Sequence, residues 1–167
     1  MHDRLTRQDI EKMEKEIEER KLKLRPELIE AVKEARAQGD LSENFEYYAA
    51  KREKNQNESR IRYLENMIKT AVIVEDHGAD DEVTMNKSVE VYFPDDDETE
   101  TFRIVTTIRG NSLKGLISID SPLGKALLHH KAGDTVHVNV NKTVGYDVEI
   151  RSIGAAADES EDEIRKF

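Results

Sequence analysis

Two amphipathic runs on either side of one short polar turn constrain this chain more than any other feature. Apolar residues recur at steps of three and four between Thr6 and Arg36, and a second such run extends from Tyr47 to Ala71. Such steps place apolar side chains along one face of a helix. Two helices joined by a short turn form an antiparallel hairpin, and about 27 residues in a helix span roughly 40 Å. We therefore expect residues 1–75 to form a long antiparallel coiled-coil hairpin.

Two features inside these runs modify that expectation. Pro26 lacks a backbone N–H, and a proline inside a continuous helix costs about 3 kcal/mol. A kink or break near Leu24 and Arg25 is therefore predicted. In the second run, Lys54 and Asn57 occupy positions that face the partner helix. The middle of the hairpin then gains little from apolar burial, and its ends must supply most of the stability.

Beyond Val74 the pattern changes to alternation of apolar and polar residues, which is typical of strands. The alternating segments are Lys87–Phe93, Thr101–Thr107, Gly115–Ile119, Thr135–Val140 and Tyr146–Ile150. Ser121 before Pro122 is a helix-start signal, which predicts a short helix over 122–130.

The chain is thus expected to be a two-domain α+β protein. The hairpin at 1–75 is followed by a linker at 76–85 and by a small antiparallel β-sheet domain with one helix at 86–154. The acidic tail at 155–167 is expected to be disordered, because it holds few residues that could build a core.

The formal net charge of −10 argues against a protein that binds nucleic acid through a broadly basic face. The charge is, however, unevenly spread. Residues 75–100 hold eleven acids and one lysine, so this window alone accounts for −10, whereas residues 51–62 carry a local charge of +3. Basic residues on one predicted helix can still contact phosphates locally.

Other bulk features narrow the function classes. The chain has no cysteine, and its five histidines are scattered without a helical pair four residues apart. Disulfides and thiolate metal sites are therefore excluded, and a permanent zinc site is not expected. There is no apolar run long enough to span a membrane and no signal-peptide pattern, so we expect a cytoplasmic protein. We also expect a monomer.

The turn of the hairpin presents two carboxylates, Asp40 and Glu43, and two interpretations remain open. Gly39 can end the first helix in a left-handed conformation, after which Asp40 can cap the second helix with Glu43 at its third position. Alternatively, two carboxylates at an exposed apex can help to hold a divalent cation. Two are too few for a tight magnesium site, so the apex would complete a site on another molecule.

Basic residues cluster just behind this apex. Arg36 and Lys33 precede the turn, and Lys51 and Arg52 follow it, so an antiparallel hairpin brings them to one end. They are either ordinary solvated side chains or contacts for the phosphates of a nucleic-acid end whose metal faces the acids.

Three further groups of residues have structural explanations from sequence alone. Asp120, Ser121 and Pro122 read as an ordinary strand-to-helix connection. His129 and His130 are expected to end the short helix, where a cation is favourable. Tyr47 and Tyr48 are expected to pack within the hairpin near its turn.

The turn and its flanks resemble the bacterial Gre transcript-cleavage factors. The segment "EARAQGDLSENFEYYAAK" (Glu34–Lys51) is similar to the family's apex pattern of Ala-Arg, two variable residues, Gly-Asp-Leu, a variable residue, then Glu-Asn, Glu-Tyr and Ala-Ala. Similar segments are "RPELIEAVKEAR" before the turn, "SRIRYLENMI" after it, and "ISIDSPLGKALLHHKAGDTVHV" in the second half. The resemblance covers almost the whole chain.

This resemblance implies a non-autonomous factor that binds bacterial RNA polymerase when the enzyme has backtracked. A C-terminal domain with an FKBP-like fold docks at the rim of the secondary channel, and the hairpin reaches the active centre. There the apex acids, Asp40 and Glu43, stabilise a second Mg²⁺ and its attacking water, so that the polymerase hydrolyses the RNA 3′ end.

The resemblance also suggests roles for other residues. Arg36, Lys51 and Arg52 are expected to contact RNA, and Asn44, Asp120, Ser121 and Pro122 to contact the polymerase. The chain departs from the family pattern at Phe45, where an aliphatic residue or alanine is usual, and at Tyr48, where histidine is frequent. The segment "FPDDDETETF" and the tail beyond Ile153 suggest a divergent paralogue and bear on docking affinity.

Two other functions are left open. A regulator could occupy the same channel without stimulating cleavage, although such proteins tend to carry more apex acids. Prolyl isomerase activity would follow from an FKBP-like fold, but aromatic residues such as Phe93, Phe102 and Tyr146 in or beside the predicted strands are too few for an aromatic-rich pocket.

Overall fold

The computed structural model describes residues 3–39, 44–75 and 78–166. Its chain forms two compact units, one containing residues 9–71 and the other residues 4–8 together with 72–166. The expected division into two domains is correct, but the boundary is not where the sequence suggested. Residues 4–8 and the predicted linker both belong to the second unit.

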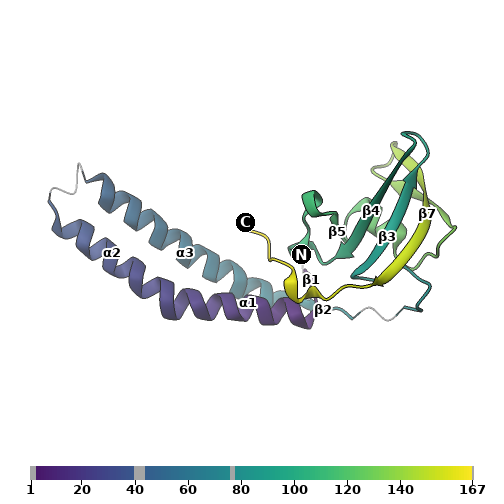
Figure 1. Cartoon of the computed structure of the whole chain (residues 1–167). Helices are drawn as coiled ribbons and strands as arrows, with labels where there is room; N and C mark the ends of the chain where they lie inside the picture. Colours follow the sequence, from purple (N-terminus) through teal and green to yellow (C-terminus); the bar gives the residue numbers. More distant parts are fainter. Residues whose placement is uncertain (1–2, 40–43, 76–77, 167) are drawn as a thin grey trace. The chain divides into compact units, whose positions relative to one another are not determined.

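The first unit is a helical hairpin, as predicted. Helix α1 (Arg7–Glu19) continues through a π-helical segment (Arg20–Leu24) into α2 (Arg25–Ala37), and α3 (Phe45–Thr70) runs back alongside them (Figure 1). The residues buried in α2 and α3 include Leu28, Ala35, Tyr47, Ile61 and Leu64. These positions follow the amphipathic steps of the sequence.

The predicted irregularity before Pro26 is confirmed as a change of helix type. The N–H of Arg25 bonds to the carbonyl of Arg20, five residues earlier, which widens the turn. Pro26 then enters α2 at its second position, where the missing N–H costs little. The helix is therefore continuous through this point instead of broken.

The polar middle of the hairpin is held by hydrogen bonds. Asn57 is 3% exposed, its Oδ1 accepts from Arg20 Nη1 at 3.0 Å, and its Nδ2 donates to the Arg20 carbonyl at 3.3 Å. Arg60, 5% exposed, donates to both carboxylate oxygens of Glu16, at 2.7 and 3.2 Å. Polar residues that face a partner helix are thus paired across the hairpin, as burial requires.

The second unit contains two sheets. Strands β1 (Arg4–Leu5) and β2 (Val72–Ile73) form a short parallel pair. The main sheet has the order β5-β4-β3-β7-β6. Its strands are β3 (Lys87–Phe93), β4 (Glu98–Val105), β5 (Leu116–Ser118), β6 (Thr135–Asn139) and β7 (Gly145–Ala156).

The main sheet is mixed, which corrects the expectation of an antiparallel one. Strand β5 pairs with β4 in parallel register, Ile104 opposite Ile117, while the other pairings are antiparallel. The connection from β4 to β5 runs through two short 3₁₀ turns and returns the chain in the same direction. Helix α4 (Pro122–Leu127) is shorter than predicted and adds Leu127 to the core.

The predicted linker at 76–85 is wrong in its last part, because residues there pack into the core. Val83 is fully buried and Met85 nearly so. The backbone of Val83 exchanges two hydrogen bonds, each 2.8 Å long, with His129 and His130 after α4. Apolar residues inside an acidic segment therefore anchor it to the sheet unit.

The prediction of a disordered tail at 155–167 also differs from the structure. Arg109 has a fully buried guanidinium, whose Nη1 donates to Asp162 at 2.7 Å and whose Nη2 lies 3.2 Å from a carboxylate oxygen of Glu159. Asp162 also pairs with Arg103. The acidic composition suggested a solvated tail, but the buried guanidinium needs counter-charges and the tail supplies them.

Candidate functional site at the hairpin turn

Asn44 joins the two helices at the turn. Its side-chain Oδ1 accepts from the Tyr47 N–H at 3.0 Å and so caps the start of α3. Its Nδ2 donates to the Ala35 carbonyl in the last turn of α2 at 2.5 Å. One side chain therefore bonds to a backbone donor of one helix and to a backbone acceptor of the other.

This arrangement corrects the capping interpretation of the apex acids. The N-cap of α3 is Asn44, so the role that the spacing offered to Asp40, with Glu43 at the third position, belongs to another residue. Asp40 and Glu43 themselves lie outside the described residues. Gly39, the last described residue before them, has the positive φ of 140° that was expected after the first helix.

Two of the predicted RNA-binding cations lie close to the ring of Tyr47. It is buried at 8% exposure, as expected of a residue that packs in the hairpin. The Arg36 guanidinium lies 5.6 Å from the ring centroid and the Lys51 ammonium 6.0 Å from it. Cations at this range are attracted to the ring face, so Arg36 from α2 and Lys51 from α3 are brought together.

The Tyr47 hydroxyl responds to the same two cations. A hydrogen bond from Arg36 Nη2, 3.5 Å from the Tyr47 oxygen, lowers the pKa of the phenol below its ordinary value. Burial acts in the opposite direction, and the charge of Lys51 adds to the lowering. The Tyr47 side chain therefore keeps two cationic side chains, Arg36 and Lys51, close together near the turn.

The remaining predicted cation and the second tyrosine are at the surface. Arg52 is exposed on α3 and makes no ion pair with any described residue. Tyr48 is 47% exposed, although it was expected to pack inside the hairpin, and its ring makes an edge-on contact with Tyr47 at 5.4 Å between centroids. Phe45, the first residue of α3, is 84% exposed.

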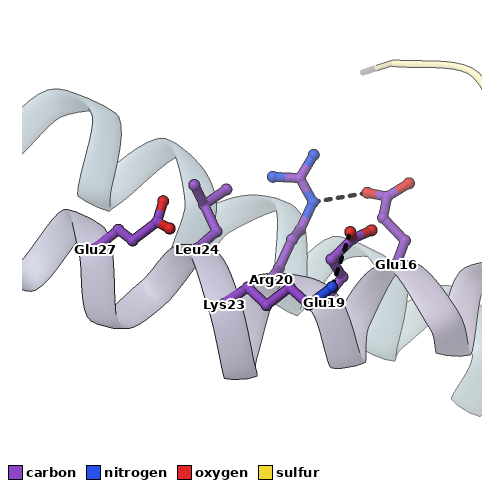
Figure 2. A pocket seen from close by; sticks show the side chains of 6 residues that line it. All are labelled: Glu16, Glu19, Arg20, Lys23, Leu24 and Glu27. Atoms are coloured by element: carbon purple, nitrogen blue, oxygen red, sulfur yellow. Dashed lines mark hydrogen bonds and ion pairs between the residues drawn. The ribbon is translucent and has the colours of Figure 1, made fainter.

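A shallow cleft lies farther along the hairpin, beside the π-helical segment. Figure 2 shows the side chains that line it: Glu16, Glu19, Arg20, Lys23, Leu24 and Glu27. Arg20 Nε donates to Glu16 at 2.8 Å, and Lys23 Nζ lies 4.0 Å from Glu19. Because both basic side chains are paired with glutamates and only Glu27 adds a further charge, this cleft is not a candidate site for a charged ligand.

In the second unit, the predicted polymerase-binding residues have structural roles. Ser121 caps α4 by accepting from the Gly124 N–H at 3.0 Å, with Pro122 as the first helical residue. The carboxylate of Asp120 pairs with Arg4 of β1 and accepts from Thr107 Oγ1 at 2.7 Å. Asp120 and Pro122 remain exposed.

The Asp120 contacts also set its protonation. Burial alone raises the pKa of this carboxyl, but the hydrogen bonds from Arg4 and Thr107 outweigh burial and leave the pKa below its ordinary value. Asp120 therefore carries its negative charge at neutral pH.

Sequence reasoning missed the roles of two residues, Asn44 and Arg109. Asn44 stands three residues before Tyr47, a spacing that fits an N-cap, so the signal was present but was assigned four residues too early. Arg109 gave no signal, because a single arginine in the segment "TTIRGN" reads as a surface residue. Its burial depends on the tail, which is 50 residues later.

The structure adds two observations about metals and membranes. In residues 3–39, 44–75 and 78–166, no three acidic or histidine side chains come together in a way that could hold a metal ion. Among the helices of the same residues, none is both long and apolar enough to cross a membrane.

Comparison with known families matches both units. The family described as "Transcription elongation factor, N-terminal" matches residues 4–73, and that described as "Transcription elongation factor, GreA/GreB, C-term" matches residues 78–155. Together the two matches span nearly all of the described residues, so they account for the hairpin and for the mixed sheet.

Individual relatives carry the same names. The transcription elongation factor GreA of Thermotoga petrophila is 47% identical over 135 residues, covering 81% of this chain and 86% of the relative. GreA of Streptococcus pneumoniae serotype 19F is 43% identical over 155 residues, covering 92% and 96%. The solved structure of GreA factor homolog 1 of Thermus thermophilus is 27% identical, with a TM-score of 0.42, covering 93% of this chain and 100% of that one. The resemblance predicted from the apex segment is confirmed.

Proposed function

Because the chain belongs to the GreA/GreB family of transcription elongation factors and is most like GreA, we propose that it binds bacterial RNA polymerase through the secondary channel. There it stimulates the polymerase's own hydrolysis of backtracked RNA 3′ ends and so rescues arrested complexes. The chain is a cofactor for this reaction and not a nuclease by itself. It acts as a monomer in the bacterial cytoplasm, where its partner works.

The observation that carries this proposal is the joining of the two helices at the turn. Asn44 bonds to both helix ends, directly after Glu43 in the sequence. These two bonds hold together the helix ends on either side of the turn, where the sequence places Asp40 and Glu43. This supports the assignment of Asp40 and Glu43 as the acting carboxylates.

The chemistry of these two side chains fits magnesium. Carboxylate oxygens are the ligands that Mg²⁺ prefers, but the ion also needs water, phosphates or further protein ligands. Asp40 and Glu43 therefore complete a site whose other ligands come from the polymerase and the RNA. When bound there, Mg²⁺ supplies a more acidic water as nucleophile. The two carboxylates would orient the attacking water and accept its hydrogen bonds.

The cations behind the turn bind the RNA backbone. Arg36 and Lys51 both lie close to one buried ring, that of Tyr47, and Arg52 follows Lys51 as an exposed residue of α3. Positive groups at this place neutralise phosphates of the extruded RNA and position the bond to be cut. Asn44 supports RNA binding indirectly, because it joins the helix ends that carry these cations.

The second unit docks on the polymerase. Asp120 and Pro122 are exposed at the start of α4, and Ser121 fixes the backbone between them through its cap. A rigid, exposed corner that carries both charges of the Asp120–Arg4 pair offers polar contacts to a surface at the rim of a channel. Its contribution is affinity and not chemistry.

The test is a cleavage assay on a stalled, backtracked elongation complex with magnesium. We expect the wild-type chain to shorten the RNA from its 3′ end faster than the polymerase alone. Asp40→Asn and Glu43→Gln should abolish the stimulation while still competing for polymerase binding. Glu46→Gln is the matched control, since Glu46 is an exposed acid in the first turn of α3. This variant should stimulate cleavage as well as the wild-type chain does.

Two results would contradict the proposal. If the wild-type chain binds the polymerase but gives no shortening above the intrinsic rate, the chain is a channel-binding regulator. If Asp40→Asn loses polymerase binding as fully as cleavage, the carboxylate has a structural role instead.

A further inference from the structure

Two exposed aromatic rings stand out at the start of α3. Among the aromatic residues that the structure describes, Phe45 and Tyr48 alone are exposed, at 84% and 47%. They are three residues apart in one helix, a spacing that places their side chains on neighbouring positions of one face. The other described aromatic rings are buried or half-buried.

The two rings share one end of the hairpin with the cations of the turn. Tyr48 contacts Tyr47 edge-on, and Tyr47 in turn lies under Arg36 and Lys51. A single exposed apolar side chain needs no explanation. Two exposed rings of α3, at the same end of the hairpin as the cations of α2 and α3, make a surface that is both apolar and basic.

We propose that Phe45, supported by Tyr48, stacks on a nucleobase of the extruded RNA 3′ segment. Aromatic rings interleaved with cations are the arrangement that binds single-stranded nucleic acid, in which bases stack on rings and phosphates meet the cations. The proposal rests on the proposed function, because it takes the RNA 3′ segment as the ligand. Phe45 is thereby a substrate-positioning residue of the hairpin turn.

The chemistry of the rings predicts how selective this contact is. Phe45 has no hydrogen-bonding group, so it can recognise the flat face of any base but not its edge. Stacking therefore holds the RNA 3′ segment without reading its sequence. A hydrophobic protein partner would gain nothing from the adjacent Arg36 and Lys51, whereas RNA uses both the rings and the charges.

The first experiment compares base-bearing and abasic RNA. Backtracked complexes are assembled with a mismatched RNA 3′ segment that either carries its bases or lacks them. Phe45→Ala should slow stimulated cleavage of the base-bearing RNA between about 5-fold and 100-fold, the range that the loss of one stacked base corresponds to. On abasic RNA, Phe45→Ala and wild type should cleave at the same, reduced rate.

Two further variants and one control sharpen this experiment. Phe45→Trp should retain the wild-type rate, because it keeps a flat ring, whereas Phe45→Leu should behave as Phe45→Ala. Leu22→Ala removes an apolar side chain that is 68% exposed elsewhere on the hairpin and should have no effect. Competition for polymerase and circular dichroism verify that each variant folds and docks.

A second measurement separates this inference from the proposed function. An RNA with 4-thiouridine at its 3′ end, held in a backtracked complex with calcium in place of magnesium, should photocrosslink to the first turn of α3. Phe45→Ala should reduce this crosslink even though no cleavage takes place. If wild type crosslinks but does not stimulate cleavage in magnesium, the stacking stands and the cleavage function fails.

Either of two results would overturn the stacking proposal. One is equal cleavage by Phe45→Ala and wild type on base-bearing RNA, which would leave the cleavage function intact. The other is an absence of the crosslink to α3 in a complex that has bound the wild-type chain.

Discussion

The side-chain amide of Asn44 lies 2.5 Å from the carbonyl oxygen of Ala35, and through this contact the start of α3 is tied to the end of α2. The same side chain accepts the Tyr47 N–H. The two bonds use opposite chemistry, since one needs a donor and the other an acceptor. Only an amide side chain of this length can make both.

Substitutions of Asn44 should show how much each of these two hydrogen bonds contributes to stability. Asn44→Ala loses both and should lower the free energy of unfolding by about 1–2 kcal/mol, the usual cost of a lost cap. Asn44→Asp keeps the acceptor but loses the donor to Ala35, so its cap survives while the link between the helices does not. Urea unfolding should rank wild type, Asn44→Asp and Asn44→Ala in that order. Equal stability of Asn44→Ala and wild type would show that the link contributes nothing.

Changes at Tyr47 should distinguish the ring from its hydroxyl. Tyr47→Phe keeps the face on which Arg36 and Lys51 lie, so cleavage should stay within about twofold of wild type. Tyr47→Leu removes the face, and with it about 0.5–1 kcal/mol for each cation. The concentration of factor that gives half-maximal cleavage should then rise several-fold. A Tyr47→Phe variant as defective as Tyr47→Leu would assign the effect to the hydroxyl.

The Glu16 carboxylate should make hairpin stability depend on pH. Burial raises the pKa of Glu16, but hydrogen bonds from Arg60 and Arg20 outweigh it, so the folded-state pKa lies below the ordinary value of 4.5. A depressed pKa gives stability that is present above pH 4.5 and is lost as the pH falls through the folded-state value. At pH 7, Glu16→Gln should therefore cost about 1 kcal/mol, a modest figure because the carboxylate is partly exposed.

The measurement compares unfolding of both chains across pH. The difference between wild type and Glu16→Gln should shrink as the pH falls below 4.5, because a protonated Glu16 resembles glutamine. Glu19→Gln, which alters an exposed pair with Lys23, should match wild type throughout. A difference that stays constant with pH would exclude the ion pair as its source.

Removal of the tail should destabilise the sheet unit. A chain that ends at residue 156 leaves Arg109 without Glu159 and Asp162, and an uncompensated buried charge costs about 3–5 kcal/mol. Arg109→Met in the shortened chain should recover part of this loss, because the charge is gone. Denaturant unfolding checks both, with Asp95→Asn as a control for one lost exposed acid. An unchanged midpoint for the shortened chain would contradict the buried ion pairs.

The sequence predicted most where the pattern is periodic and local. The amphipathic steps predicted the hairpin, the Pro26 irregularity marked the π-helical segment, and the Ser121-Pro122 signal marked the start of α4. Each of these depends on residues within a few positions of each other, so the local chemistry is decisive.

The sequence failed where distant residues decide the outcome. Val83 is apolar inside an acidic segment, and only the partner backbone after α4 makes it part of the core. The tail was acidic enough to suggest disorder, but its acids pair with Arg109 and Arg103, which are far away in the sequence. At the turn, the cap was assigned to Asp40 instead of Asn44 because both positions satisfy the same rule. The roles of Asp40 and Glu43 stay predictions.

The pairing of Asn57 with Arg20 also fixes the register between the two sides of the hairpin. Apolar side chains at heptad spacing can interdigitate equally well after a slip of one repeat, but a buried amide meets its partners at a single height. Sliding α3 past the π-helical segment would leave Asn57 and the Arg20 carbonyl buried without each other. The distance from that segment to the turn is therefore fixed, and with it how far the hairpin can reach.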